Sequence, residues 1–138
     1  MLGIREKHLY GARTYDDLTA YITETARAFG VEVEIFQSNH EGALVDKIQA
    51  AYGTADGIVI NPAAYTHTSV AILDALKAVN LPAAEVHLTD ISRREPFRQI
   101  SYAGLACQAH FIGLGFAGYG KALEWMKETL QNPGAVTR

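Results

Sequence analysis

The spacing of hydrophobic residues changes between two periods along most of the chain. Residues 14–29 carry apolar side chains three or four positions apart, which predicts a helix with Thr14 as its cap. Residues 31–37 alternate with a period of two, which predicts a strand. Further helices are predicted over 41–52, 68–79 and 117–130, and further strands over 57–61, 83–88 and 109–114. Strands that alternate with helices predict an α/β fold with a parallel sheet covered on both faces.

Residues 1–13 interrupt this alternation. They contain charged side chains and two glycines, Gly3 and Gly11, and no alternating apolar run. A doubly wound sheet normally begins with a strand, and a missing strand inside the sheet leaves unpaired backbone groups on both of its neighbours. We therefore expect either that the first central strand is missing from this chain, which would make it marginally stable, or that the fold differs.

Composition narrows the class of protein. The chain has 138 residues, of which 49% are hydrophobic and 20% charged, and this predicts one domain over residues 1–138 with a loose tail from Asn132. A net charge of -3 without a basic stripe argues against a nucleic-acid partner. No apolar run is long enough for a membrane span, and charged residues near the start are unlike a secretory signal, so we expect the cytoplasm. The lone Cys107 excludes a disulfide within the chain.

The candidate chemistry follows the predicted strands, at the sheet edge where open α/β folds bind ligands. His40, His67 and His87 all lie there, and a polar segment that starts at Asn61 suits a small ligand with hydroxyl groups. Glu85 lies two residues before His87, so both side chains project to one side of the strand. This pair is either a general acid with an orienting carboxylate or a polar pair that braces the sheet edge.

A basic segment comes next along the chain. Arg93, Arg94 and Arg98, together with Thr89, are suited to bind an anion such as a carboxylate, although a solvated basic loop is equally common.

Three other patterns are weaker. Residues 113–118 match G-x-G-x-x-G, but no acidic residue follows a second strand about 20 residues later, so we expect these glycines to serve close packing of helix on sheet. Ser38, Ser69, His67 and Asp74 lack the G-x-S-x-G turn of a hydrolase. No two histidines have the spacing of four that a helical metal site needs, so no metal is expected.

Five blocks of residues, spread over nearly the whole chain, are more specific than any single motif. They are Gly3, Arg5 and Glu6 with Tyr10 and Gly11; residues 37–42; residues 60–62 with 65–69; residues 85–87; and Arg94 and Glu95 with Phe97 and Arg98. Together they resemble type II 3-dehydroquinate dehydratase. The resemblance implies a flavodoxin-like fold, a trans dehydration of 3-dehydroquinate to 3-dehydroshikimate without a cofactor, and a homo-oligomer, a dodecamer built from trimers.

The resemblance also implies a role for each matching residue. Tyr10 matches a lid tyrosine that removes the C2 proton as a phenolate, and Arg5 matches the arginine that helps to ionise it. His87 matches the general acid that protonates the departing C1 hydroxyl, and Glu85 orients it. A free tyrosine titrates near ~10, so such a base needs a cationic neighbour. The implied substrate-binding residues are Asn61, His67, Leu88, Thr89 and Arg98, with Asp74 reaching a neighbouring subunit's site.

Several positions depart from the family pattern. The family begins with a strand that ends in Asn-Gly-Pro-Asn and carries the asparagine that stabilises the enolate, and this sequence starts just after it. The replaced residues are a proline by Lys7, a glycine by Ala63, an arginine by Leu73, an asparagine by Asp90 and a histidine by Ser92. Asp90 places a negative charge near the expected carboxylate site, which should weaken binding. The alternative to an active dehydratase is therefore an impaired relative that binds a small carboxylate or only assembles, and we expect poor solubility or very low activity.

Overall fold

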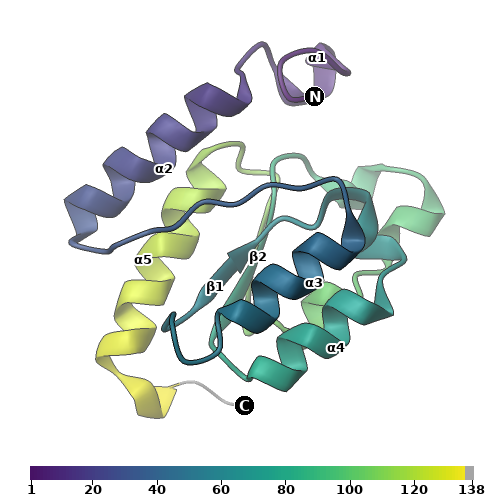
Figure 1. Ribbon diagram of the computed structural model, residues 1–138. Coiled ribbons are helices and arrows are strands. Elements are labelled where there is room, and N and C mark those ends of the chain that lie inside the picture. Colours follow the sequence, from purple (N-terminus) through teal and green to yellow (C-terminus); the bar gives the residue numbers. More distant parts are fainter. Residues whose placement is uncertain (136–138) are drawn as a thin grey trace.

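The computed structural model describes residues 1–135, and Figure 1 shows the order of its elements. The α-helices are α1 (Lys7–Tyr10), α2 (Tyr15–Phe29), α3 (Glu41–Ala50), α4 (Val70–Val79) and α5 (Ala117–Gln131). The strands are β1 (Ile58–Ile60), β2 (Ala83–His87) and β3 (Ala109–Ile112). Short 3-10 helices, η1 (Ala63–His67), η2 (Ile91–Arg93), η3 (Pro96–Gln99), η4 (Ala103–Ala106) and η5 (Pro133–Ala135), occupy the loops.

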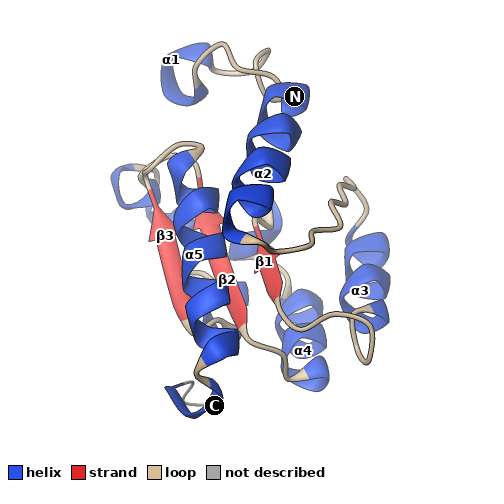
Figure 2. Cartoon of the chain, turned by 90° about the vertical axis from the view of Figure 1, so that its left-hand side faces the viewer, coloured by secondary structure: helices blue, strands red, loops and turns tan. Residues whose placement is uncertain are grey.

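The three strands form a parallel sheet in the order β1-β2-β3, with helices on both faces (Figure 2). In β2, Ala84 and Val86 pack with Ala122 of α5 on one face. Ala83 packs with Ile72 and other residues of α4 on the opposite face. Because side chains alternate along a strand, Glu85 and His87 share the face of Ala83. The predicted two-sided parallel sheet is confirmed, and it fixes the direction of both polar side chains.

The helix predicted from Thr14 is confirmed together with its cap. The Thr14 hydroxyl accepts a hydrogen bond from the Asp17 backbone N–H at 3.2 Å, and Asp17 accepts one from the Thr14 N–H at 2.8 Å. Gly30 ends the helix with a φ of 70°, in the left-handed region that glycine adopts without a steric cost. The other predicted helices and the strands over 57–61, 83–88 and 109–114 also form, with ends displaced by up to two residues.

The strand predicted over residues 31–37 is wrong. The segment runs alongside the body of the protein as an irregular loop (Figure 1), and within residues 1–135 it pairs with no strand of the sheet. Val33 contacts the α2–α5 cluster, but Ile35 and Phe36 are 37% and 46% exposed, so only some of the apolar side chains pack against the body. A strand requires a neighbour with free backbone groups, and that requirement cannot be read from side-chain alternation.

Both ends of the described part of the chain contain short helical segments. The short helix α1 forms where the sequence predicted only an irregular polar segment. The predicted loose tail includes η5, and residues 136–138 lie outside the described part of the chain. Within that described part, every helix is too short or too polar to cross a membrane.

The glycines of the G-x-G-x-x-G string have two different roles, close packing and a tight turn. A Cβ atom on Gly118 would lie 3.2 Å from the Val86 side chain, so this glycine does allow α5 to pack closely on the sheet. Gly113 and Gly115 have φ angles of 79° and 58°, so they are required by the turn that leaves β3. The expectation of close packing is correct for Gly118 alone.

Ala63 occupies a backbone conformation that favours glycine. Its φ is 51°, and an L-residue in the left-handed region costs roughly 1–2 kcal/mol. Ala63→Gly should therefore raise the free energy of unfolding by up to about 1 kcal/mol, after the greater freedom of glycine in the unfolded chain is subtracted. Urea unfolding measures this value. Ala64→Gly, at a neighbour without positive φ, is the matched control and should lower it; equal losses in both variants would contradict the strain at Ala63.

Candidate functional site

A small hollow of about 150 Å³ opens where α1 meets the carboxyl edge of the sheet. It is lined by Leu9, Tyr10, Arg13, Leu88, Gly115 and Phe116. Tyr10 comes from α1, Leu88 follows β2 and Gly115 follows β3, so three distant segments meet there. The Gly115 N–H donates to the Leu88 carbonyl at 3.0 Å, which holds the two loop segments together. The hollow therefore lies at the edge where the sequence places its candidate chemistry.

Below this edge, Glu85 and His87 form a buried pair. Glu85 is 1% exposed and His87 is 5% exposed. The His87 Nε2 atom lies 3.0 Å from Glu85 Oε2, and the Ser101 hydroxyl donates to the same oxygen. An ionised carboxylate only accepts hydrogen bonds, so His87 carries a proton on Nε2 and its Nδ1 is left for another partner.

The other Glu85 oxygen has a different partner. The His110 Nδ1 atom lies 3.0 Å from Oε1 and comes from β3, where His110 is directly opposite Glu85 in the register of the sheet. Burial alone would raise the pKa of Glu85, but the hydrogen bonds from His87, Ser101 and His110 lower it to about 2. Glu85 is therefore a buried negative charge with a donor on each oxygen.

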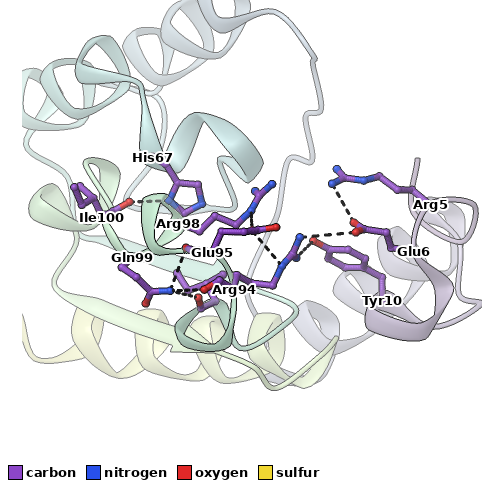
Figure 3. A network of polar contacts seen from close by, with 10 residues as sticks. Arg5, Glu6, Tyr10, His67, Arg94, Glu95, Arg98, Gln99 and Ile100 are labelled. Carbon is purple, nitrogen blue, oxygen red and sulfur yellow. Dashed lines mark hydrogen bonds and ion pairs between the residues drawn. The ribbon is translucent and has the colours of Figure 1, made fainter.

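Tyr10 is contacted by Arg94, an arginine from the loop that follows β2 (Figure 3). Arg94 Nη1 donates to the Tyr10 hydroxyl at 3.1 Å, and the Arg94 side chain is only 12% exposed. Its second nitrogen lies 3.9 Å from Glu6, which also pairs with Arg5 at 3.0 Å. The hydrogen bond to Tyr10 raises the pKa of Arg94, which keeps the guanidinium charged. The arginine in contact with Tyr10 is thus Arg94, whereas Arg5 is exposed and contacts Glu6.

The loop that carries Arg94 is braced by Gln99. The Gln99 amide donates to the carbonyls of Ile91 and Arg94 at 2.9 and 3.1 Å, with a longer contact of 3.5 Å to the carbonyl of Glu95. Arg98 donates to the Glu95 carboxylate in the same loop (Figure 3). These contacts make the basic segment an ordered loop that aims Arg94 at Tyr10.

His67 and Asn61 lie in the polar segment after β1. The His67 Nδ1 atom lies 2.7 Å from the Ile100 carbonyl oxygen, and a carbonyl only accepts, so Nδ1 carries the proton and Nε2 is left as an acceptor. Asn61 Oδ1 accepts from the Ala63 N–H at 3.1 Å, and the Asn61 side chain also hydrogen-bonds to Tyr119 of α5. His67 therefore offers one acceptor atom to a polar ligand.

Two acidic residues differ in how they relate to this site. Asp90 accepts from the Ser92 N–H at 3.0 Å and pairs with Arg93 at 3.6 Å, so its charge is partly compensated. These contacts with Ser92 lower the pKa of Asp90. Asp74 lies on the exposed face of α4, and within residues 1–135 no hydrogen bond or ion pair joins it to the site.

The described residues offer no obvious metal site. Among residues 1–135, no group of three or more histidine, cysteine or acidic side chains is placed to hold a metal ion.

Burial and the nearby charge of Glu85 raise the pKa of the Cys107 thiol to about 12, so this side chain is neutral at physiological pH.

Known proteins resemble this chain over most of its length. The sequence profile of the family described as Dehydroquinase class II matches residues 1–127. The chain belongs to this family. A 3-dehydroquinate dehydratase of Clostridium acetobutylicum is 48% identical over 129 residues, which are 94% of this chain and 90% of that protein. A catabolic 3-dehydroquinase of Aspergillus clavatus is 52% identical over 124 residues, which are 90% of this chain and 83% of that one.

Solved structures lead to the same family. The crystal structure of a type II dehydroquinase from Butyrivibrio crossotus has a TM-score of 0.88 and 48% sequence identity, and the match covers 91% of this chain and 88% of that chain. The flavodoxin-like α/β fold that the resemblance implied is confirmed.

Three residues of this class II dehydroquinase join the network without having been assigned a role from the sequence. Ser101 and His110 bind Glu85, and Gln99 orders the loop of Arg94. Only the register of β2 and β3, which places Glu85 opposite His110, could have indicated one of them.

The charge on Glu85 makes the stability of this dehydroquinase depend on pH. Its pKa falls on folding from 4.5 to about 2, so the stabilisation is complete above pH 4.5 and is lost as the pH drops toward 2. The shift corresponds to about 3 kcal/mol. Glu85→Gln removes the charge, so we expect its deficit in urea-unfolding free energy relative to the wild type to shrink between about pH 5 and 2.5. A deficit that is constant with pH would show that the charge of Glu85 does not stabilise the fold.

Proposed function

We propose that this protein converts 3-dehydroquinate to 3-dehydroshikimate by a trans elimination of water through an enolate. Its family and the activities named for its relatives support the reaction. The observation that carries the mechanism is that Tyr10, held by Arg94, lines the same hollow as Leu88, the residue that follows His87. The proposed base and the segment that carries the proposed acid thus meet at one small site.

Tyr10 is the proposed base. A guanidinium beside a phenol oxygen favours its ionised form, and Arg94 is charged and mostly buried. The Tyr10 phenolate takes the proton from C2, and the electron pair of that C–H bond moves toward the C3 carbonyl, whose oxygen becomes the enolate oxygen. The Arg94 contact supports this role for Tyr10 more directly than Arg5 does, although the resemblance assigns Arg5 to it.

His87 is the proposed general acid. When the enolate collapses, the bond from C1 to its hydroxyl breaks, and that oxygen takes a proton from His87 and leaves as water. Glu85 fixes the ring through the hydrogen bond from Nε2 at 3.0 Å, so the proton that the leaving oxygen takes comes from Nδ1. Glu85 is therefore a positioning residue that acts through His87.

The remaining polar residues are proposed to hold the substrate. Asn61 and Thr89, with the backbone amides of Leu88 and Thr89, bind the carboxylate and the C1 hydroxyl. His67 and Arg98 contact the other ring hydroxyls, and the acceptor atom of His67 described above is suited to a hydroxyl donor. The compensated charge of Asp90 reduces its repulsion of a carboxylate, which favours an active enzyme over an impaired relative.

Two substitutions test the proposed base and acid. Tyr10→Phe should abolish turnover and leave substrate affinity within roughly tenfold, because the phenol oxygen is required only for chemistry. His87→Ala should lower kcat by on the order of 10²-fold or more. Formation of the enone is followed by ultraviolet absorbance, with the exposed Tyr52→Phe as a control. Retained turnover in Tyr10→Phe would remove it as the base.

The same assay separates the two arginines. Arg94→Met should reduce kcat about tenfold more than Arg5→Met, because only Arg94 contacts the phenol oxygen. A larger loss in Arg5→Met would instead assign the ionising role to Arg5.

We further infer that the chain assembles into a homo-oligomer built from trimers, in which Asp74 completes a neighbouring subunit's site. Apolar side chains stand out from elements beside α4: Leu105 of η4 is 70% exposed, and Val70 at the start of α4 is 51% exposed. Elements α4 and η4 contact each other, and exposed apolar side chains on neighbouring elements favour association. Asp74 lies on the exposed surface of the same helix.

Light scattering tests the assembly. The wild type should have a mass that is a multiple of three chains, and Leu105→Glu should shift it toward smaller species. Tyr52→Glu, on an exposed residue after α3, is the control. A wild type that is monomeric at micromolar concentration would contradict both the assembly and the role of Asp74.

A further inference from the structure

We propose that His110 is a positioning residue for the reaction: it holds the free oxygen of Glu85 so that the carboxylate presents its other oxygen to His87. This role rests on the proposed function of His87 as the general acid. His110 touches neither of the proposed acid–base residues, and it acts through Glu85.

The register of the sheet makes this contact possible. Glu85 and His110 are directly opposite each other on β2 and β3, so their side chains leave the sheet side by side. His110 Nδ1 lies 3.0 Å from Glu85 Oε1, while His87 and Ser101 both donate to Oε2. The carboxylate is thus held at both oxygens, and it cannot rotate toward a new partner without losing one of these bonds.

The surroundings of Oε1 leave little room for a replacement. A Cβ atom on Gly104 would lie 2.8 Å from Oε1 and 2.8 Å from the Ser101 hydroxyl oxygen, so the backbone of η4 closes over the carboxylate. Within residues 1–135, His110 is the one hydrogen-bond donor to Oε1. Glu85 is almost fully buried, whereas 44% of the His110 side chain is exposed, so the histidine seals the carboxylate from the solvent side.

His110 therefore binds the Glu85 oxygen that His87 does not contact. The titratable groups around Glu85 are His87 on the same strand, His110 on β3 and Cys107 after η4, and the thiol stays neutral. The hydrogen bond from His110 draws part of the negative charge of the Glu85 carboxylate toward Oε1, which is the oxygen farther from the His87 contact. Without it, the carboxylate is free to turn, so the His87 ring is held less well in place. More of the negative charge then faces His87, so the acid releases its proton less readily.

Two substitutions isolate this contact. His110→Val keeps a residue that is suited to a strand but removes the donor. His110→Asn retains an N–H donor near the position of Nδ1 and is the conservative rescue. Ile112→Val, two residues further on β3 and on the same face, is the matched control for a change of shape alone.

Steady-state kinetics over a range of pH is the main measurement. In His110→Val, kcat should fall about three- to tenfold with KM within about twofold of the wild type, because transition-state proton transfer is affected more than binding. The high-pH limb of the kcat profile should move to higher pH. His110→Asn should restore both properties, and Ile112→Val should leave them unchanged.

Nitrogen NMR of labelled histidine gives a readout that needs no turnover. The wild type should show His87 with its proton on Nε2 and His110 with its proton on Nδ1. His110→Val should give a mixture of His87 tautomers, and His110→Asn should preserve the single form. Circular dichroism and melting curves show whether each variant is folded, and if His110→Val does not fold, His110→Leu, which also lacks a donor, takes its place.

The outcomes separate this role from the proposed function. If His87→Ala destroys activity but His110→Val matches the wild type in kcat, pH profile and His87 tautomer, the positioning role is wrong. If His87→Ala remains fully active, the general-acid assignment fails instead, and the tautomer measurement still decides whether His110 fixes Glu85. Equal losses of kcat in His110→Val and Ile112→Val would show an effect of packing alone and would also overturn the role.

Discussion

The buried charge of Glu85 is the constraint on which the centre of this structure depends. A carboxylate that is 1% exposed requires donors on its oxygens, and these come from its own strand, from β3 and from the loop before η4. The same contacts link the two strands, orient the His87 ring and lie directly beside Gly104. The stability of the fold and the proposed acid catalysis by His87 therefore depend on one set of hydrogen bonds.

Residues that are close together in the sequence were sufficient to predict most of the helices and strands. Thr14 caps its helix through the backbone of the first turn, and Gly30 ends it, so both boundaries depend on nearby residues. The segment over residues 31–37 shows the limit of such signals. Its side chains alternate as a strand requires, but membership of a sheet depends on what lies beside it, and alternation says nothing about neighbours.

The candidate site likewise combines a contact that the sequence predicted with one that it could not predict. Glu85 and His87 could be paired from the sequence because two positions along a strand share a face, and the structure brings them to 3.0 Å. Arg5 is close to Tyr10 in sequence, yet Arg94, 84 positions away, makes the contact. That geometry depends on the folded loop that Gln99 braces, and no local pattern specifies it. The roles in catalysis that the resemblance assigns to individual residues stay predictions.

The helix α1 has no buried residue and is only one turn long, so little hydrophobic surface holds it over the hollow. Its connection to the body includes the polar contacts of Arg94 with Tyr10 and Glu6. Dissolved ions weaken the Arg94–Glu6 ion pair, in which the Glu6 side chain is 31% exposed, whereas they hardly affect the packed core. Opening of this segment therefore responds to ionic strength far more than unfolding of the sheet does, and it involves only a small change in heat capacity.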